Sequence, residues 1–295
     1  MKKRVMALGL AATVGIFGMA ALAGCNGGEE DTGVKYITTA IMRKANSGTR
    51  GAFDELVVNS EGKALKGLTL TGAWLTEVDQ TGTVITTIAG KTSFLGYISM
   101  GSVDANTDKI KAVKVNGVEG TVANVLSGEY ELSRPFNLIY EADTLSDAAK
   151  NFLSYIYSED GAAIVNTEWI AVEKPAGVAD YTPYSGSAET VQLTGSTSLQ
   201  PMIEVLAESY MKENENVTIK WGGGGSGEAL AAVKDGSADF GMISREAKDG
   251  ELDYTVTEVA RDGIAVIVDK NCPLTEVTFD QLYDLYANGT KIECK

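Results

Sequence analysis

Three turns rich in glycine, serine and threonine each lie between a β-rich run and a helix-forming segment, at residues 46–50, 195–198 and 222–227. A strand that feeds such a turn and then a helix gathers free backbone N–H groups at the positive end of the helix dipole. That arrangement suits an anion, although serine and threonine also cap helices that bind no ligand. One such turn arises readily by chance. Three in one chain indicate an α/β fold whose turns act together.

In the first turn, residues 46–50, Ser47 and Thr49 flank Gly48, and Arg43 precedes the turn. A glycine at this point allows a ligand to approach the backbone without meeting a Cβ atom. The hydroxyls add hydrogen-bond donors and the arginine adds positive charge. The turn therefore predicts either an anion site or an ordinary helix cap.

The glycine-rich turn at 222–227 has three possible interpretations: an anion site, a dinucleotide site or a flexible linker. It is not a phosphate-binding loop of the Walker A type, because no Lys-Ser or Lys-Thr pair follows Gly227. A dinucleotide site would need an acidic residue at the end of a second strand, and Asp239 lies at about that spacing. A flexible linker remains the other interpretation.

Composition excludes several classes of function. The formal net charge is −15, and residues 1–24 contribute +3 through Lys2, Lys3 and Arg4, so the remainder carries −18. This acidity argues against nucleic acid as a partner. The chain has no histidine, which removes Ser-His-Asp and Cys-His catalysis and the commonest metal ligand. We therefore expect a protein that is not an enzyme and that holds neither a metal nor a cofactor.

The cysteines are Cys25, Cys272 and Cys294. They are too few and too widely spaced for a zinc ribbon. Cys272 and Cys294 either pair in an oxidising location or stay free, and the sequence leaves both alternatives open.

The N-terminus is typical of an export signal, with a basic start followed by an apolar stretch from Val5 to Leu22. The stretch is almost long enough for a permanent membrane helix, which is the alternative. However, Leu22-Ala23-Gly24-Cys25 is similar to a bacterial lipobox, whose cysteine is lipidated. We therefore predict a lipoprotein signal peptide over 1–24, acyl chains such as palmitate on Cys25, and a tether over 25–33. The protein would then lie outside the cytoplasmic membrane, anchored to it by lipid.

Beyond the tether, the motifs resemble those of the phosphate-binding proteins of ABC importers. They cover nearly all of residues 34–295. The motifs that carry this resemblance are Thr194-Gly195-Ser196-Thr197-Ser198, Gly224-Gly225-Ser226-Gly227, Ala238-Asp239-Phe240-Gly241-Met242, Ser244-Arg245-Glu246, Arg43 with Ser47-Gly48-Thr49-Arg50, Gly96-Tyr97-Ile98-Ser99 and Leu132-Ser133-Arg134-Pro135. The resemblance implies a two-lobed α/β fold of the periplasmic-binding-protein-like type II class, with its ligand between the lobes.

The order of the motifs departs from the family pattern, in which the Gly-Ser-Thr-Ser segment comes first. Each motif occurs once, so the chain resembles one complete copy that is circularly permuted, with 174–190 as the permutation linker. One lobe (A) would then span 136–262, and the other (B) would combine 34–135 with 265–295. The alternative is a truncated tandem, with the rear of one copy followed by the front of the next. The two hypotheses differ in whether 191–295 folds back on 34–173.

Carried over motif by motif, the resemblance implies a phosphate site and no catalytic residues. The residues expected to bind phosphate are Thr197, Ser198, Ser226, Asp239, Arg43, Ser47, Gly48 and Thr49. Asp239 would accept the proton that phosphate retains and sulfate lacks, and its alternative role is a turn or cap. Arg50 and Arg245 would orient the loops.

The resemblance further implies inorganic phosphate as ligand, the membrane permease of an ABC importer as partner, and a monomer. Other functions stay open. A phosphate-ester hydrolase is disfavoured, because no nucleophile–base pair is evident. A surface or adhesion lipoprotein that does not bind phosphate, a fragment without activity, and a binder of another oxyanion are the remaining alternatives.

Overall fold

The computed structural model describes residues 35–294, and its central feature is a mixed β-sheet of nine strands among those residues. The strand order is β3-β2-β4-β11-β7-β10-β8-β9, and β5 pairs with β11 beside this path. The strands of this sheet are β2 (Thr39–Arg43), β3 (Leu75–Val78), β4 (Phe94–Ser99), β5 (Ile110–Ala112), β7 (Ser133–Tyr140), β8 (Glu189–Gly195), β9 (Val217–Gly223), β10 (Phe240–Ile243) and β11 (Thr255–Asp269).

Helices and short strands complete the fold. The α-helices are α1 (Gly48–Leu56), α2 (Thr81–Ile88), α3 (Val122–Leu126), α4 (Asp147–Ile156), α5 (Glu159–Val165), α6 (Gln200–Glu213), α7 (Ser226–Lys234) and α8 (Phe279–Asn288). The short strands and 3₁₀ turns are β1 (Tyr36–Ile37), β6 (Lys114–Val115), β12 (Glu276–Val277), β13 (Ile292–Glu293), η1 (Met100–Ser102), η2 (Asp104–Asn106) and η3 (Asp249–Glu251).

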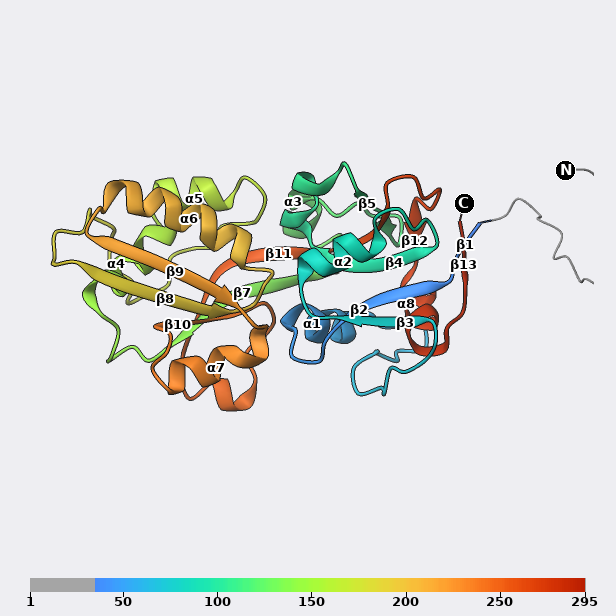
Figure 1. The fold of residues 1–295 in the computed structure, drawn as a ribbon, viewed down its shortest axis with the longest axis horizontal. Helices are drawn as coiled ribbons and strands as arrows, with labels where there is room; N and C mark the ends of the chain where they lie inside the picture. Colours follow the sequence, from blue (N-terminus) through green and yellow to red (C-terminus); the bar gives the residue numbers. More distant parts are fainter. Residues whose placement is uncertain (1–34, 295) are drawn as a thin grey trace, which may run out of the picture. The chain divides into compact units, whose positions relative to one another are not determined.

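Two strands, β7 and β11, connect two lobes (Figure 1). The first part of β11 pairs with β7 from Thr255 to Gly263, and its second part pairs with β4 from Ile264 to Val268. We call the part built on β8, β9 and β10 lobe A, and the part built on β2, β3, β4 and β5 lobe B. This architecture confirms the predicted two-lobed α/β fold.

Each lobe has a hydrophobic core of its own. In lobe A, Phe152 of α4 and Ile203 of α6 are fully buried together with strand residues such as Phe240. In lobe B, Phe53 of α1 stacks on Tyr97 of β4 with ring centroids 3.9 Å apart. Burying one side chain of this size stabilises a fold by roughly 1.5–3 kcal/mol. The cores therefore hold each lobe rigid and leave the two connecting strands as the joint.

Both halves of the sequence contribute strands to the same sheet. Strand β10 pairs antiparallel with β7, with Gly241 opposite Ile139. Strand β11 pairs with β4, β5 and β7, which all come from the first half of the chain. Residues 191–294 therefore fold back on 35–173, as the hypothesis of a foldable permutant requires.

The segment 174–190 has the predicted irregular character up to Glu189, where β8 begins, but it packs firmly on lobe A. The Tyr181 ring lies edge-on to Tyr155, with centroids 5.0 Å apart. Its hydroxyl donates to Glu213 Oε2 at 3.0 Å and accepts from Asn214 Nδ2 at 3.0 Å. This connection is therefore part of the lobe A surface.

The two ends of the described chain lie side by side. Strand β1 pairs antiparallel with β13, so Tyr36 faces Glu293 and Ile37 faces Ile292. In Figure 1 the C-terminus accordingly lies next to β1.

The predicted signal peptide, Cys25 and the tether lie outside the described residues. Within residues 35–294, the helices are all too short or too polar to cross a membrane.

Candidate functional site

The turn at 46–50 has the predicted strand–turn–helix geometry. Strand β2 ends at Arg43, and α1 begins at Gly48. Ser47 caps this helix, since its Oγ accepts a hydrogen bond from the Arg50 N–H at 3.3 Å. Part of the turn is thus an ordinary helix cap, while the Ser47 hydroxyl keeps a proton that it can donate.

The other two turns meet at one edge of lobe A. Strands β8, β9 and β10 are parallel, and their registers place Gly195 beside both Gly223 and Met242. Because the carboxyl ends of parallel strands share an edge, the turns that follow them converge there. Gly195 has a φ of 129°, and a Cβ atom at this position would lie 2.4 Å from the Met242 carbonyl oxygen. Only glycine allows the chain to turn here.

Side chains from both lobes contact one another where these turns meet. Thr49 Oγ1 and Ser198 Oγ share a hydrogen bond of 2.7 Å. Arg43 Nη2 donates to Thr197 Oγ1 at 2.9 Å. A Cβ atom on Gly48 would lie only 2.2 Å from Ser226 Oγ. Six of the predicted site residues, from three turns, therefore form one cluster across the two lobes.

Arg43 is the charge of this cluster, and its side chain is buried with a residue exposure of 1%. Its other guanidinium hydrogen bonds go to Thr81 Oγ1 at 3.2 Å and the Asp79 carbonyl at 2.7 Å, and its Nε has no partner. Among residues 35–294 no carboxylate forms an ion pair with it. Burial lowers the pKa of Arg43 to about 10, so it stays charged at neutral pH.

A second buried arginine lies beside the cluster, but its charge is balanced. Arg134 Nε and Nη2 donate to Asp262 Oδ2 at 3.3 and 3.0 Å, and Ser99 Oγ donates to Asp262 Oδ1 at 3.0 Å. Arg134 Nη1 also donates to the Ser244 carbonyl at 3.3 Å. Arg134 and Asp262 cancel, so Arg43 leaves a net charge of +1 in this region. A buried charge without a partner is costly, and an anion would offset that cost.

The chain is similar in sequence to several known proteins. A sequence profile described as the PBP superfamily domain matches residues 27–160 and 182–292. Phosphate-binding protein PstS 2 of Streptococcus agalactiae serotype V is 34% identical over 293 residues, which cover 98% of this chain and 97% of that protein. The chain belongs to the family of phosphate-binding proteins.

Two further relatives come from Streptococcus pneumoniae. Phosphate-binding protein PstS 2 of serotype 4 is 36% identical over 248 residues, which cover 84% of this chain and 83% of that protein. The crystal structure of a phosphate ABC transporter phosphate-binding protein from strain TIGR4 has a TM-score of 0.64 and 34% identity. It covers 87% of this chain and 98% of its own. The family is one of binding proteins, which agrees with the expectation that this member is not an enzyme.

In this family member Asp239 does not lie with the cluster, and the prediction that places it beside the anion is wrong. Asp239 precedes β10, whereas Ser244 follows β10 and lies in the cluster. Five residues of extended chain separate them by about 16 Å. The Asp239 carboxylate accepts a hydrogen bond from the Gln192 N–H at 2.7 Å, which is the structural role left as its alternative. The motif predicts the strand but does not indicate which end of it faces the cleft.

The structure adds two hydroxyls that the sequence analysis did not assign to the site, Ser196 and Ser244, which are 2% and 0% exposed. Ser196 Oγ donates to Ser244 Oγ at 2.9 Å, and the Ser244 N–H donates to Ser226 Oγ at 3.1 Å. Ser244 directly follows β10, so the rule that selected the hydroxyls after β8 would also have selected it.

Arg50 and Arg245 position backbone near the cluster, as expected. Arg50 Nη1 donates to the Arg43 carbonyl at 3.0 Å and to Glu77 Oε2 at 2.9 Å. Arg245 forms a bidentate pair with Glu251, with both distances 2.7 Å. These partners neutralise both guanidinium groups, so Arg43 stands out as the arginine of the cluster that lacks a carboxylate.

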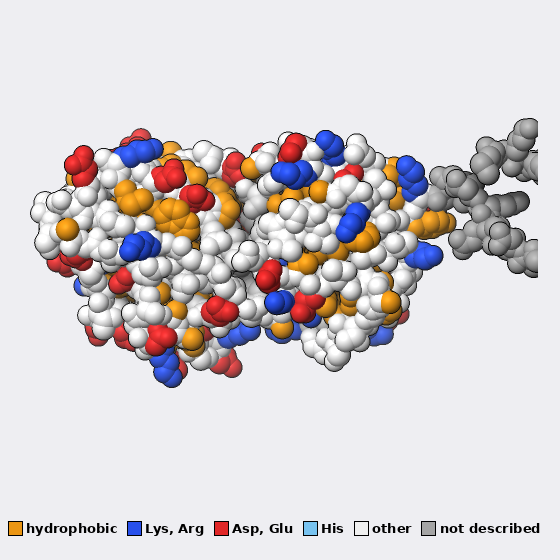
Figure 2. Space-filling model, viewed as in Figure 1, with side chains coloured by type: hydrophobic (Ala, Val, Ile, Leu, Met, Phe, Trp, Pro, Cys, Tyr) orange, Lys and Arg blue, Asp and Glu red, His pale blue; other side chains and the backbone are white. Residues whose placement is uncertain are grey.

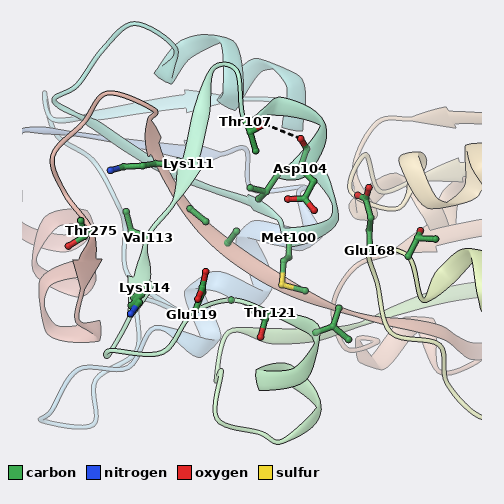
Figure 3. A pocket seen from close by; sticks show the side chains of 16 residues that line it. Met100, Asp104, Thr107, Lys111, Val113, Lys114, Glu119, Thr121, Glu168 and Thr275 are labelled. Carbon is green, nitrogen blue, oxygen red and sulfur yellow. Dashed lines mark hydrogen bonds between the residues drawn. The ribbon is translucent and has the colours of Figure 1, made fainter.

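Two cavities lie elsewhere in the described residues, and the cluster lines neither of them. The larger measures about 590 Å³, and Figure 3 shows Glu168 on the opposite side of it from Lys111. Its lining mixes lysines and carboxylates, whereas the cluster has one sign of charge. On the face shown in Figure 2, Lys and Arg side chains are interspersed with those of Asp and Glu.

Proposed function

We propose that this protein binds inorganic phosphate outside the cytoplasmic membrane and delivers it to the permease of an ABC importer. The observation that carries the proposal is Arg43, a buried cation with no carboxylate partner, surrounded by hydroxyls of both lobes. A tetrahedral anion with four oxygens can accept hydrogen bonds from several such donors at once. The names of the streptococcal relatives point to the same ligand.

In this proposal Arg43 balances the charge of phosphate, and the hydroxyls of Thr49, Thr197, Ser198 and Ser226 donate to its oxygens. The backbone at Gly48 adds an N–H donor at the N-terminus of α1, whereas the Ser47 N–H already donates to the Lys44 carbonyl at 2.9 Å. Asp239 has no part in it.

Closure of the lobes would form the site. The bonds between Thr49 and Ser198 and between Arg43 and Thr197 both cross from lobe B to lobe A. When the lobes separate, Arg43 and the hydroxyls lose these partners. The oxygens of phosphate can then accept their hydrogen bonds instead. The motion would be a hinge at β7 and β11.

Thermal denaturation with and without phosphate tests the proposal. Arg43→Met should remove the stabilisation by phosphate, because it deletes the charge of the cluster. Lys91→Met is the matched control, since Lys91 lies over the exposed side of Phe94 and away from the cluster. A midpoint that phosphate leaves unchanged in the wild-type protein would refute phosphate binding.

We further propose that the chain is a circularly permuted member of this family that acts as a monomer. The pairing of β10 and β11 with β7 supports one folded unit, in contrast to a truncated tandem. Because the match covers 97% of the Streptococcus agalactiae relative, that relative would share the proposed permuted order. A single unfolding transition that phosphate shifts as a whole would support this proposal, and two independent transitions would contradict it.

The lipid anchor on Cys25 belongs to the same proposal and rests on the lipobox-like sequence. Cells grown with a labelled palmitate should label the wild-type chain. The Cys25→Ser chain should stay unlabelled and be released from the membrane fraction. Labelling of both chains would contradict the anchor.

A further inference from the structure

The hydrogen-bonding groups of the cluster have one property in common. Apart from Arg43, its side chains are hydroxyls of serine and threonine, namely Ser47, Thr49, Thr81, Ser196, Thr197, Ser198, Ser226 and Ser244. A hydroxyl both donates and accepts, and its proton rotates toward whichever partner is present. A hydroxyl can therefore form a hydrogen bond with either a protonated or an unprotonated oxygen of a ligand.

Three carboxylates near the cluster are held by other partners, while the exposed Glu228 lies beside Gly224 in the first turn of α7. Asp262 pairs with Arg134 and Ser99, Asp54 pairs with Arg50, and Glu251 pairs with Arg245. Asp239 lies at the far end of β10. Asp79 offers its backbone carbonyl to Arg43, while its carboxylate is 57% exposed and lies 4.0 Å from Lys44. Among residues 35–294, no carboxylate forms a hydrogen bond with a hydroxyl of the cluster.

Three backbone carbonyls around the cluster each accept one hydrogen bond from within the protein. The Asp79 carbonyl accepts from Arg43, the Gly224 carbonyl from Asn46 Nδ2, and the Met242 carbonyl from the Ser196 N–H. A group that only accepts hydrogen bonds would favour an anion that carries a proton. The cluster offers a bound anion donors and groups that can do either.

We infer that this site takes tetrahedral oxyanions as a class and selects them by charge, without requiring a proton on the ligand. The inference rests on the proposed phosphate function and extends it. Phosphate as the dianion should bind more tightly than the monoanion, because Arg43 interacts with a larger charge. Sulfate, which carries no proton at these pH values, should compete with phosphate.

Calorimetry with the wild-type protein tests this, using sodium phosphate and sodium sulfate at equal ionic strength. The titrations are done at two pH values, about 5.5 and about 8.5, which lie on either side of the second ionisation of a phosphate group. Phosphate should bind about tenfold or more tightly at the higher pH. Sulfate should bind equally at both, and within about tenfold of phosphate at the higher pH.

A sulfate affinity more than about 100-fold below that of phosphate at the higher pH would overturn the inference. So would tighter phosphate binding at the lower pH. Either result would leave phosphate binding itself intact. The absence of phosphate binding at both values would instead refute the proposed function.

Two variants sharpen the test. Ser244→Asp places a carboxylate in the cluster and should lower sulfate affinity about tenfold or more, relative to phosphate, at the lower pH. Asp239→Asn is the control, because that side chain bonds Gln192 outside the cluster, and it should leave the ratio of affinities unchanged. A changed ratio in Asp239→Asn would overturn the inference. If Ser244→Asp fails to fold, the wild-type series still decides the question.

Discussion

Gly48→Ala is the most direct test of the closed arrangement, because it adds one methyl group at the contact between the lobes. The new Cβ would lie 2.2 Å from Ser226 Oγ and 2.7 Å from Ser244 Oγ. Ordinary contacts begin at about 3.4 Å, so the lobes must move apart by about 1 Å. The lobes themselves should tolerate the change, since alanine replaces glycine in the first turn of α1.

The magnitude follows from the bonds that cross between the lobes. A separation of this size weakens the bond between Thr49 and Ser198, worth about 1 kcal/mol, and the charged bond from Arg43 to Thr197, worth about 2 kcal/mol. If the separation weakens the contacts of the phosphate-bound form by the same amount, the loss is about 3 kcal/mol, which lowers phosphate affinity roughly 100-fold. The helix itself should gain about 0.5–1 kcal/mol from the substitution.

Gly51→Ala is the matched control on the same helix. Its Cβ atom would lie 3.5 Å from Arg245 Cδ, an ordinary contact, so it should share the gain in helix stability and keep phosphate affinity. Calorimetry measures affinity, and thermal denaturation without phosphate measures stability. Gly48→Ala with affinity within about threefold of wild type would refute the argument. An equal loss in Gly51→Ala would do the same.

Three other predictions concern stability. Burial raises the pKa of Asp54 to about 6, above its unfolded value, so the folded state binds the proton more tightly and stability falls as pH rises from about 4 to 6. The free energy of unfolding of Asp54→Asn, measured relative to wild type by denaturation at each pH, should therefore rise over that range by on the order of 1–3 kcal/mol. A difference that stays constant with pH would contradict the prediction. The Cys272 and Cys294 thiols lie together, and burial raises the pKa of Cys294 to about 11. Because the two thiols lie together, excess oxidised glutathione should join them in a disulfide, so that a thiol assay detects the loss of both at once. The free energy of unfolding should rise by about 3 kcal/mol. Cys294→Ser should show no such rise, and loss of one thiol without the other would contradict the pairing. Tyr181→Ala should lower the free energy of unfolding by about 2–3 kcal/mol, because it removes a ring contact and hydrogen bonds. Phosphate affinity measured by calorimetry should not change, because 174–190 packs on lobe A away from the cluster. An altered affinity would argue against that separation.

Local patterns predicted the elements that carry the site. The turn at 46–50 does open a helix, and the turns at 195–198 and 222–227 do lead into α6 and α7. Such features depend on residues a few positions apart, so the sequence contains all the information they need.

The placement of Asp239 and Ser244 shows where this local information ends. Both residues flank the same short strand, and the sequence of a strand does not indicate which of its ends lies at the cleft. The end that faces the cleft is settled by the direction in which β10 pairs with β8 and β7. Those partners lie about 50 and 100 residues away along the chain, beyond the range of any local pattern.

The sequence by itself determined the class of fold, the three turns, the arginine and the hydroxyls that a tetrahedral anion needs. It also determined that histidine chemistry is absent. The tertiary structure decided which hydroxyls meet, that Arg43 is buried without a carboxylate, and that the two halves of the chain share one sheet. The physical reason is that charge balance and burial are properties of neighbours in space, and here those neighbours come from segments some 150 residues apart, such as Thr49 and Ser198.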